Sequence, residues 1–288
     1  MTPLRLEAPA KLNLSLQVVG RRPDGFHELD TVMVLLDLAD QLLLMPGASG
    51  LRVESATPDD IPTGADNLAW RGLLAGLGGE PDLACLALRK QIPAASGLGG
   101  GSSDAAAAWR LGRRWCGADE ATTAADLVAL AGIGADVPFF AARLAAAQVS
   151  GIGEGVASIP PPTAEVYAVL VHPPFRLRTA EVFGALRLSD WSTEGRSGNP
   201  LEPGSNDLLA PALRLRPEID DLFRLVLSAG GVPHLTGSGP TVYALVDDAE
   251  RAARIGERLR RAGLRVSDTR LRREPASIEL LGDHEEDE

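Results

Sequence analysis

The chain has 288 residues, of which 45% are hydrophobic and 23% are charged, a composition typical of a globular protein that buries a sizeable core. Its 28 basic and 39 acidic side chains give a formal net charge of −11, and five of the negative charges lie in the last six residues. A nucleic-acid-binding protein normally displays a basic face, so the charge disfavours that class. The length fits two domains or one large domain.

The few cysteines and histidines argue against two further kinds of site. Cys85 and Cys116 cannot build a disulfide framework, and the four histidines lack the spacing of zinc ligands.

Arg5, Glu7 and Lys11 interrupt any signal-peptide core, and no apolar run approaches the ~18 residues that span a bilayer. We therefore expect a cytoplasmic protein that binds neither membrane nor nucleic acid.

The hydrophobic pattern predicts a mixture of strands and helices. In chain order, strands are predicted at residues 4–19, 31–38, 42–45, 51–54, 83–91, 145–150, 166–171, 241–246 and 264–270. Helices are predicted at residues 67–77, 102–117, 120–131, 207–214, 217–229 and 248–262. Asp66 is predicted to cap the first helix, Ser102 or Ser103 opens the second, and a loop rich in Pro, Gly and Ser spans 189–205. Because strands and helices do not alternate strictly, the pattern indicates the α+β class.

A glycine-rich segment joins a predicted strand to a predicted helix. Its residues are Pro93, Ala94, Ala95, Ser96, Gly97, Leu98, Gly99, Gly100, Gly101, Ser102, Ser103 and Asp104. Glycines let backbone N–H groups approach an anion, and the unpaired N–H groups of a helix N-terminus favour phosphate. The segment therefore predicts a phosphate-binding loop, and the plain alternative is a flexible loop that ends in a helix cap.

Two familiar nucleotide-binding motifs can be compared with this segment. A Walker A loop ends in Gly-Lys-Ser/Thr, and no lysine follows position 90, so that motif is excluded. A Rossmann fingerprint needs a third glycine where Ser102 stands, which leaves a dinucleotide site only weakly supported.

Lysine occurs only at positions 11 and 90, whereas the other 26 basic residues are arginine. Either these two lysines persist by chance, or each serves where a compact ammonium is needed. Lys11 and Asn13 lie two residues apart on a predicted strand, so their side chains share one face. Exposure to solvent is the ordinary explanation for such a polar pair.

Two later segments carry weaker signals. Asp136 directly precedes Val137 and Pro138, which favours a helix N-cap over a catalytic carboxylate. The segment at 236–241 (Thr-Gly-Ser-Gly-Pro-Thr) fits either a second anion-facing loop or a turn into a strand.

Taken together and in this order, the segments at 9–14, 93–106, 134–140 and 236–241 resemble the motifs of the GHMP kinase superfamily. With the segment at 24–29, the chain is most similar to the branch that acts on a cytidine diphosphate-linked methylerythritol. The resemblance implies an α+β fold of two domains with the active site between them. It places an N-terminal domain at 1–155 and a C-terminal domain at 156–282. The run of acidic residues at 283–288 predicts a tail without fixed structure.

The resemblance also implies the reaction. ATP would phosphorylate the tertiary 2-hydroxyl of this substrate, giving the 2-phosphate and ADP, in the non-mevalonate route to isopentenyl diphosphate. Asp136 would accept the hydroxyl proton, Lys11 would be its electrostatic partner, and Asn13 would orient the substrate or Asp136. Residues 93–103 would bind the ATP phosphates, with Mg²⁺ bridging them.

Further site residues carry over from the family motifs. Lys90 and Asn67 would face the nucleotide, and Asp104 would lie near its phosphates, where the family leaves a direct metal role open. The working form would be a monomer or a homodimer.

The rival hypotheses are a GHMP kinase for a smaller alcohol such as homoserine, a nucleotide-binding regulatory protein without catalysis, and, with least support, a Rossmann oxidoreductase.

The resemblance implies a clamp for the cytosine base. His27 would hydrogen-bond the edge of the base, while Phe26 and Phe183 would sandwich its ring, and Thr179 would lie near the substrate. Position 26 is often tyrosine in the family, so Phe26 keeps the stacking surface and lacks the hydroxyl. A small aliphatic alcohol would need no such clamp, which separates this hypothesis from its nearest rival.

Overall fold

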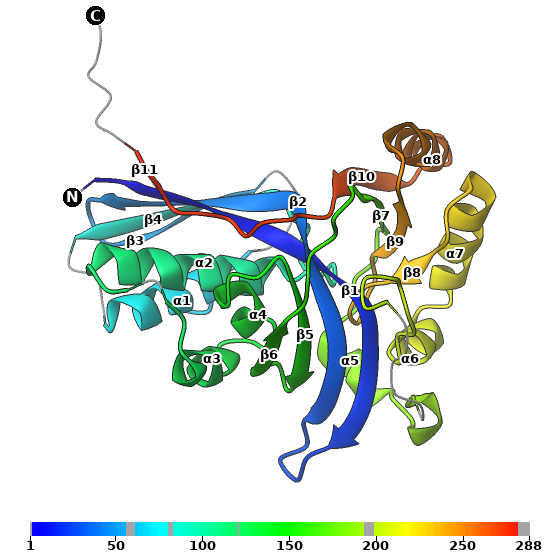
Figure 1. The fold of residues 1–288 in the computed structure, drawn as a ribbon, viewed down its shortest axis with the longest axis horizontal. Coiled ribbons are helices and arrows are strands. Elements are labelled where there is room, and N and C mark those ends of the chain that lie inside the picture. Colours follow the sequence, from blue (N-terminus) through cyan, green and yellow to red (C-terminus); the bar gives the residue numbers. More distant parts are fainter. Residues whose placement is uncertain (1, 56–60, 80–82, 120, 193–198, 282–288) are drawn as a thin grey trace, which may run out of the picture.

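The computed structural model describes residues 2–55, 61–79, 83–119, 121–192 and 199–281. Two sheets organise these residues (Figure 1). The first contains β1 (Leu4–Arg21), β2 (His27–Pro46), β3 (Gly50–Ser55), β4 (Ala84–Lys90), β5 (Ala146–Gly151), β6 (Gly155–Ser158) and β11 (Glu279–Leu280). The second contains β7 (Tyr167–His172), β8 (His234–Leu235), β9 (Val242–Val246) and β10 (Arg265–Arg270). The predicted α+β class is confirmed.

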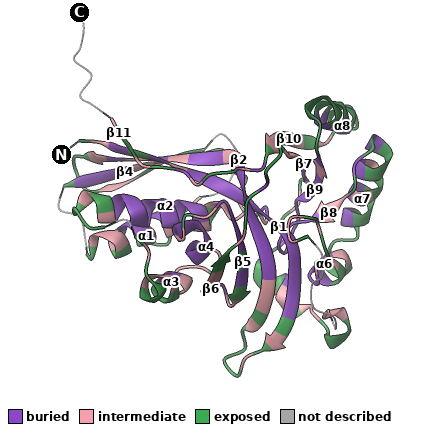
Figure 2. Ribbon diagram, viewed as in Figure 1, coloured by how far each residue is buried: buried purple, intermediate pink, exposed green. Residues whose placement is uncertain are grey.

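The strand order places the longest strands at the centre of the molecule. The first sheet runs β11-β1-β2-β4-β3, with β5 paired to the other end of β2 and β6 paired to β5, and the second runs β10-β7-β9-β8. Within the first sheet β3 and β4 pair in parallel, whereas β1, β2 and β5 pair antiparallel. The β1–β2 hairpin extends beyond the helices as an arm whose tip is exposed (Figure 2).

The helices divide between the two sheets. Their bounds are α1 (Leu68–Leu77), α2 (Gly100–Trp115), α3 (Ala124–Ala131), α4 (Val137–Ala141), α5 (Thr179–Gly184), α6 (Leu209–Leu215), α7 (Glu218–Ala229) and α8 (Ala249–Arg261). Helices α1 to α4 gather beside the first sheet, and α7 and α8 lie beside the second (Figure 1). Within the described residues, no helix has the length and apolar character required to cross a membrane.

Close packing of α1 on α2 depends on small residues. A Cβ atom added to Gly72 would lie 2.1 Å from the carbonyl oxygen of Ala105, and one added to Gly76 would lie 2.2 Å from that of Trp109. Neither approach leaves room for a side chain. Helix α1 therefore holds α2 in a fixed place, and with it the end of the glycine-rich loop from which α2 begins.

The hydrophobic cores link the two halves of the chain. Leu16 and Val18 of β1 are buried in a cluster with Ile219 and Val226 of α7, while Leu4 and Leu6 of the same strand pack with α1 and α2. The predicted domain boundary at residue 155 stays a prediction. Strand β6 crosses this boundary and β11 lies on its C-terminal side, and both pair within the first sheet.

Several predicted element boundaries are wrong. Asn67 caps α1, in place of Asp66, because its Oδ1 accepts the N–H of Ala69 at 2.8 Å. Helix α2 begins at Gly100 after a Gly99 cap in the left-handed conformation, ahead of both predicted serines. The strands predicted at 31–38 and 42–45 form the single strand β2.

Short elements escaped prediction because they carry too few residues for a periodic signal. These are α5, β6, β8, β11 and a 3-10 helix at Leu188–Asp190. The last of these begins just before the predicted loop at 189–205, of which residues 193–198 lie outside the described residues, as does the predicted acidic tail.

Candidate active site

A cavity of about 550 Å³ opens where segments from distant parts of the chain meet. They include the glycine-rich loop before α2, the polar face of β1, the residues that precede α4, and the loop at 236–241. Lys11, Asn13, Asp136, Asn67 and Lys90 all line it, although they are far apart in the sequence. The fold therefore brings most of the predicted site residues to one space.

Two glycine-rich loops pack directly on each other at this cavity. Gly97 and Gly99 have φ values of +80° and +72°, and a Cβ atom added to Gly97 would lie 2.6 Å from the carbonyl oxygen of Thr236. The N–H of Lys11 donates to the carbonyl oxygen of Leu98 at 2.9 Å, which ties the first loop to β1. The left-handed backbone and the close contact both require glycine at position 97.

The start of α2 offers backbone donors to the cavity. Its N-cap, Gly99, has no side chain, so no side-chain hydrogen bond satisfies the first N–H groups of the helix. Gly99, Gly100, Gly101 and Ser102 all line the cavity. This geometry suits the negatively charged oxygens of a phosphate chain, as the sequence predicts.

Lys11 and Asp136 form an ion pair on the wall of the cavity. The Nζ of Lys11 lies 3.3 Å from Oδ2 of Asp136, and the side chains are 4% and 27% exposed. Asp136 occupies the N-cap position of α4, but its side chain makes no capping hydrogen bond there. The helix-cap interpretation therefore does not account for this carboxylate, which remains accessible from the cavity.

Asn13 connects Lys11 to a chain of buried hydrogen bonds. Its Oδ1 accepts from Nζ of Lys11, and its Nδ2 donates to Oγ1 of Thr31 at 2.8 Å. Tyr243 donates its hydroxyl to the carbonyl oxygen of Asn13 at 3.1 Å. Lys11 and Asn13 are each 3% exposed, so solvent exposure as the explanation for this polar pair is wrong.

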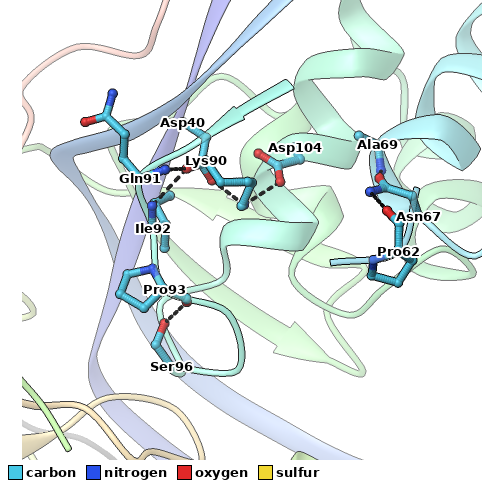
Figure 3. A network of polar contacts seen from close by, with 10 residues as sticks. All are labelled: Asp40, Pro62, Asn67, Ala69, Lys90, Gln91, Ile92, Pro93, Ser96 and Asp104. Carbon is cyan, nitrogen blue, oxygen red and sulfur yellow. Dashed lines mark hydrogen bonds and ion pairs between the residues drawn. The ribbon is translucent and has the colours of Figure 1, made fainter. Parts of the chain in front are cut away.

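Lys90 lies in a buried network with two carboxylates (Figure 3). Its Nζ pairs with Oδ2 of Asp104 at 2.6 Å and also with Asp40, whose other oxygen accepts the N–H of Ile92 at 2.8 Å. Burial raises the pKa of Asp104, and the ammonium of Lys90 opposes this rise. The two carboxylates outweigh burial and raise the pKa of Lys90. The network joins β2 to both ends of the glycine-rich loop.

Both polar atoms of the Asn67 side-chain amide make hydrogen bonds (Figure 3). Its Nδ2 donates to the carbonyl oxygen of Pro62 at 2.6 Å while its Oδ1 caps α1. No local motif marks Asp40, which lies in a different strand, so its place in the Lys90 network could not be predicted. Lys90 and Asn67 thus line the cavity with polar atoms that already have protein partners.

Two buried polar atoms at the start of α2 lack a hydrogen-bond partner, namely Oδ1 of Asp104 and Oγ of Ser103. A carboxylate oxygen beside a phosphate-binding loop is the kind of ligand that Mg²⁺ takes together with phosphates and water. Within the described residues, no group of three or more His, Cys, Asp or Glu side chains could hold a metal on its own. The unpartnered Oδ1 of Asp104 has the chemistry of a ligand for a Mg²⁺ ion that enters with a nucleotide.

The predicted base clamp is only partly assembled. His27 stacks on Phe183 of α5, with ring centroids 5.2 Å apart and an interplanar angle of 22°. Phe183 and Thr179 line the cavity, and Oγ1 of Thr179 lies 3.1 Å from Oγ of Ser238. Phe26 is 60% exposed in the hairpin turn and is not among the described residues that line the cavity. Burial, with a smaller effect of Arg21, lowers the pKa of His27.

Comparison with known proteins adds evidence from outside this chain. The family model described as GHMP kinases N terminal domain matches residues 67–143, and the one described as GHMP kinases C terminal matches residues 191–264. The 4-diphosphocytidyl-2-C-methyl-D-erythritol kinase of Rhodopseudomonas palustris is 39% identical over 278 residues, covering 87% of this chain and 91% of that protein.

Solved structures agree with these matches. The crystal structure of a 4-(cytidine 5'-diphospho)-2C-methyl-D-erythritol kinase has a TM-score of 0.75 at 33% identity, covering 92% of this chain and 98% of that chain. Homoserine kinase from Cytophaga hutchinsonii has a TM-score of 0.66 at 18% identity, covering 97% and 98%. The second likeness is one of fold alone.

Proposed function

Because the chain belongs to the 4-diphosphocytidyl-2-C-methyl-D-erythritol kinases, a branch of the GHMP kinases, we propose that it phosphorylates the 2-hydroxyl of that substrate with ATP. The products are the 2-phosphate and ADP, in the non-mevalonate route to isopentenyl diphosphate. The observation that carries this proposal is the Lys11–Asp136 pair, which lies on one cavity with the start of α2.

Asp136 acts as the general base. Its partly exposed carboxylate accepts the proton of the 2-hydroxyl, which requires an approach of ~3 Å. The hydroxyl oxygen then forms a bond to the γ-phosphorus while the bond between that phosphorus and the bridging oxygen breaks. The electron pair of the broken bond leaves with ADP.

Lys11 supplies fixed positive charge at the point of transfer. Its ammonium is buried, so solvent screens it weakly, and it lies within reach of both Asp136 and the incoming phosphoryl group. Asn13 holds this ammonium through Oδ1, and its own position is held by Thr31 and Tyr243. The pair therefore needs little rearrangement when substrate binds.

The glycine-rich loop and the first turn of α2 bind the ATP phosphates through backbone N–H groups. Lys90 and Asn67 contribute to the nucleotide side of the same cavity. A Mg²⁺ ion that enters with ATP would be held by Asp104, which lines the cavity and whose Oδ1 has no hydrogen-bond partner among the described residues. When bound, the ion neutralises charge on the phosphate oxygens.

The cytidylyl group binds on the side of His27, Phe183 and Thr179. The imidazole reads the edge of the base, and the ring of Phe183 provides a stacking surface. Phe26 would complete the sandwich by moving in from the hairpin turn, where it is now exposed. A cytoplasmic location and a monomer or homodimer as the working form are part of the same proposal.

A substrate panel tests the proposal. ADP release from Mg-ATP is measured with the cytidylyl substrate, homoserine, mevalonate and galactose. Turnover of the cytidylyl compound alone supports the assignment. Turnover of another alcohol instead would show that the protein is a kinase with a different substrate. ATP binding without any turnover would support a non-catalytic protein.

A further inference from the structure

The imidazole of His27 is bounded on two sides by aromatic rings. Phe183 stacks on it, and Trp191 meets it nearly edge-on, with ring centroids 6.1 Å apart and an interplanar angle of 79°. His27 begins β2, whereas the other two rings come from α5 and from the residue that follows the 3-10 helix Leu188–Asp190. The stacked ring of Phe183 therefore limits tilting of the imidazole, and the edge-on ring of Trp191 limits its rotation.

Trp191 is held in place through the residues on both sides of it. Before it, the carboxylate of Asp190 accepts from Nη1 of Arg214 at 3.1 Å and from the N–H of Arg187 at 2.7 Å. After it, Ser192 donates its N–H and its hydroxyl to Asp207, at 2.9 and 2.6 Å.

Asp207 links this segment to the strand that carries the catalytic lysine. It is only 6% exposed, and its Oδ2 also accepts the N–H of Val18 in β1 at 2.8 Å. The indole of Trp191 packs half-buried against the core that contains Val18. Trp191 is therefore fixed relative to β1 by hydrogen bonds and by packing, although its sequence context carries no motif.

We propose that Trp191 is a positioning residue for His27, and that by fixing the plane of the imidazole it sets the preference for cytosine over uracil. The proposal rests on the proposed function in one respect, namely that His27 reads the base. Trp191 itself need not touch the substrate.

The chemistry of the two bases explains why the ring plane matters. A neutral imidazole offers one donor and one acceptor. Cytosine presents an amino donor beside a ring-nitrogen acceptor, and uracil presents an acceptor and a donor in the reverse order. The two ring nitrogens point in different directions, so one of them at a time meets the edge of the base, and a ring that turns over replaces that nitrogen with a C–H group. A ring held by Phe183 and Trp191 keeps one nitrogen toward the base, where as an acceptor it pairs with the amino group of cytosine and meets a carbonyl oxygen in uracil.

The positive charge of Arg21 favours a neutral imidazole at His27. Arg21, at the end of β1, lowers the pKa of His27, as burial does to a larger extent. Arg21 pairs with His27 directly across the hairpin. Removing the indole would expose the imidazole and raise its pKa toward the ordinary value.

The test compares Trp191→Leu, Trp191→Phe and the matched control Trp115→Leu, which removes a half-buried indole at the far end of α2. We expect Trp191→Leu to raise KM for the cytidylyl substrate about tenfold and to reduce the preference over its uridylyl analogue by a similar factor, with KM for ATP within about twofold. Trp191→Phe keeps an aromatic edge, so its KM for the cytidylyl substrate and its base preference should stay near the wild-type values. Trp115→Leu should change neither quantity.

Titration of the His27 ring by NMR, assigned with His27→Gln, separates this inference from the proposed function. We expect its pKa to rise in Trp191→Leu, even if wild-type protein proves inactive on the cytidylyl compound. An unchanged KM, selectivity and His27 pKa in folded Trp191→Leu would overturn the inference. If that variant does not fold, Ser192→Ala, which loosens the anchor at Asp207, must show the same changes in smaller size, and unaltered values there would equally overturn it.

Discussion

The ammonium of Lys11 lies 3.3 Å from the carboxylate of Asp136, and only the second of these side chains is appreciably exposed to the cavity. The buried cation is held by Asn13, so the acidic partner alone is free to meet a substrate. This asymmetry supports the proposed division of roles, in which Asp136 accepts the proton and Lys11 stabilises the transferred charge.

Asp136→Asn is expected to lower kcat by about 10²–10⁴-fold, the range for loss of a general base, while ATP affinity stays nearly unchanged. Rapid-quench turnover and ATP titration give the two numbers. The matched control is Asp221→Asn, an exposed carboxylate on α7 that pairs only at the surface with Arg224. Near-normal turnover in Asp136→Asn would remove Asp136 from the mechanism.

Lys11→Met and Asp136→Asn should show strong coupling. If the pair acts as a unit, the double variant is hardly slower than either single variant, because the first change already disables the second residue. Lys11→Arg should not restore activity, because the larger, planar guanidinium cannot keep the same contacts with Asn13 and Asp136. Losses in kcat that simply multiply would mean that the two groups act independently.

Lys90→Met tests whether the buried network supports the loop. The substitution leaves Asp40 and Asp104 buried without their cation, and removal of one partner from a buried ion pair costs about 3–5 kcal/mol of unfolding free energy. Urea denaturation measures the loss. Lys90→Met combined with Asp104→Asn and Asp40→Asn should recover part of it, and an unaltered denaturation midpoint in Lys90→Met would show that the network contributes little.

The sequence predicted much of this site because its signals are local. Glycines before α2, the Lys11–Asn13 spacing and Asp136 before Pro138 are readable within a few residues, and the fold brings them together. Burial of Lys11 could not be predicted, because the loops that cover it come from distant positions. Asp40 lies on another strand, and Trp191 follows a single short turn, so neither had a pattern that could reveal its role.

Gly72→Ala is expected to separate α1 from α2. The added methyl would lie 2.1 Å from a backbone oxygen, and such overpacking costs about 1–3 kcal/mol of unfolding free energy. Because Asn67 caps α1 and α2 begins at the end of the glycine-rich loop, KM for ATP should also rise. Gly79→Ala is the control, since nothing lies within 4 Å of its added Cβ atom. Equal stability of both variants would contradict the packing argument.

His172 should make the fold sensitive to acid. Burial lowers its pKa to about 4, against an ordinary value of 6.5, so the unfolded chain binds this proton first as the pH falls. The contribution of His172 is therefore fully present above pH 6.5 and is lost between pH 6.5 and about 4. In His172→Gln the unfolding free energy should fall less over this interval, as measured by urea denaturation at matched pH values. Parallel curves for the two proteins would contradict the assignment.

The position of the new phosphate distinguishes transfer to the 2-hydroxyl from transfer to any other hydroxyl of the substrate. Carbon 2 of the methylerythritol unit is tertiary and carries no hydrogen, so a phosphate on its hydroxyl has no three-bond coupling to a proton. After incubation of the protein with Mg-ATP and the cytidylyl substrate, the account predicts a new phosphomonoester that appears as a singlet in the proton-coupled phosphorus NMR spectrum, and no such signal with Asp136→Asn. A doublet or triplet would place the phosphate on a secondary or primary hydroxyl and would contradict the proposed reaction.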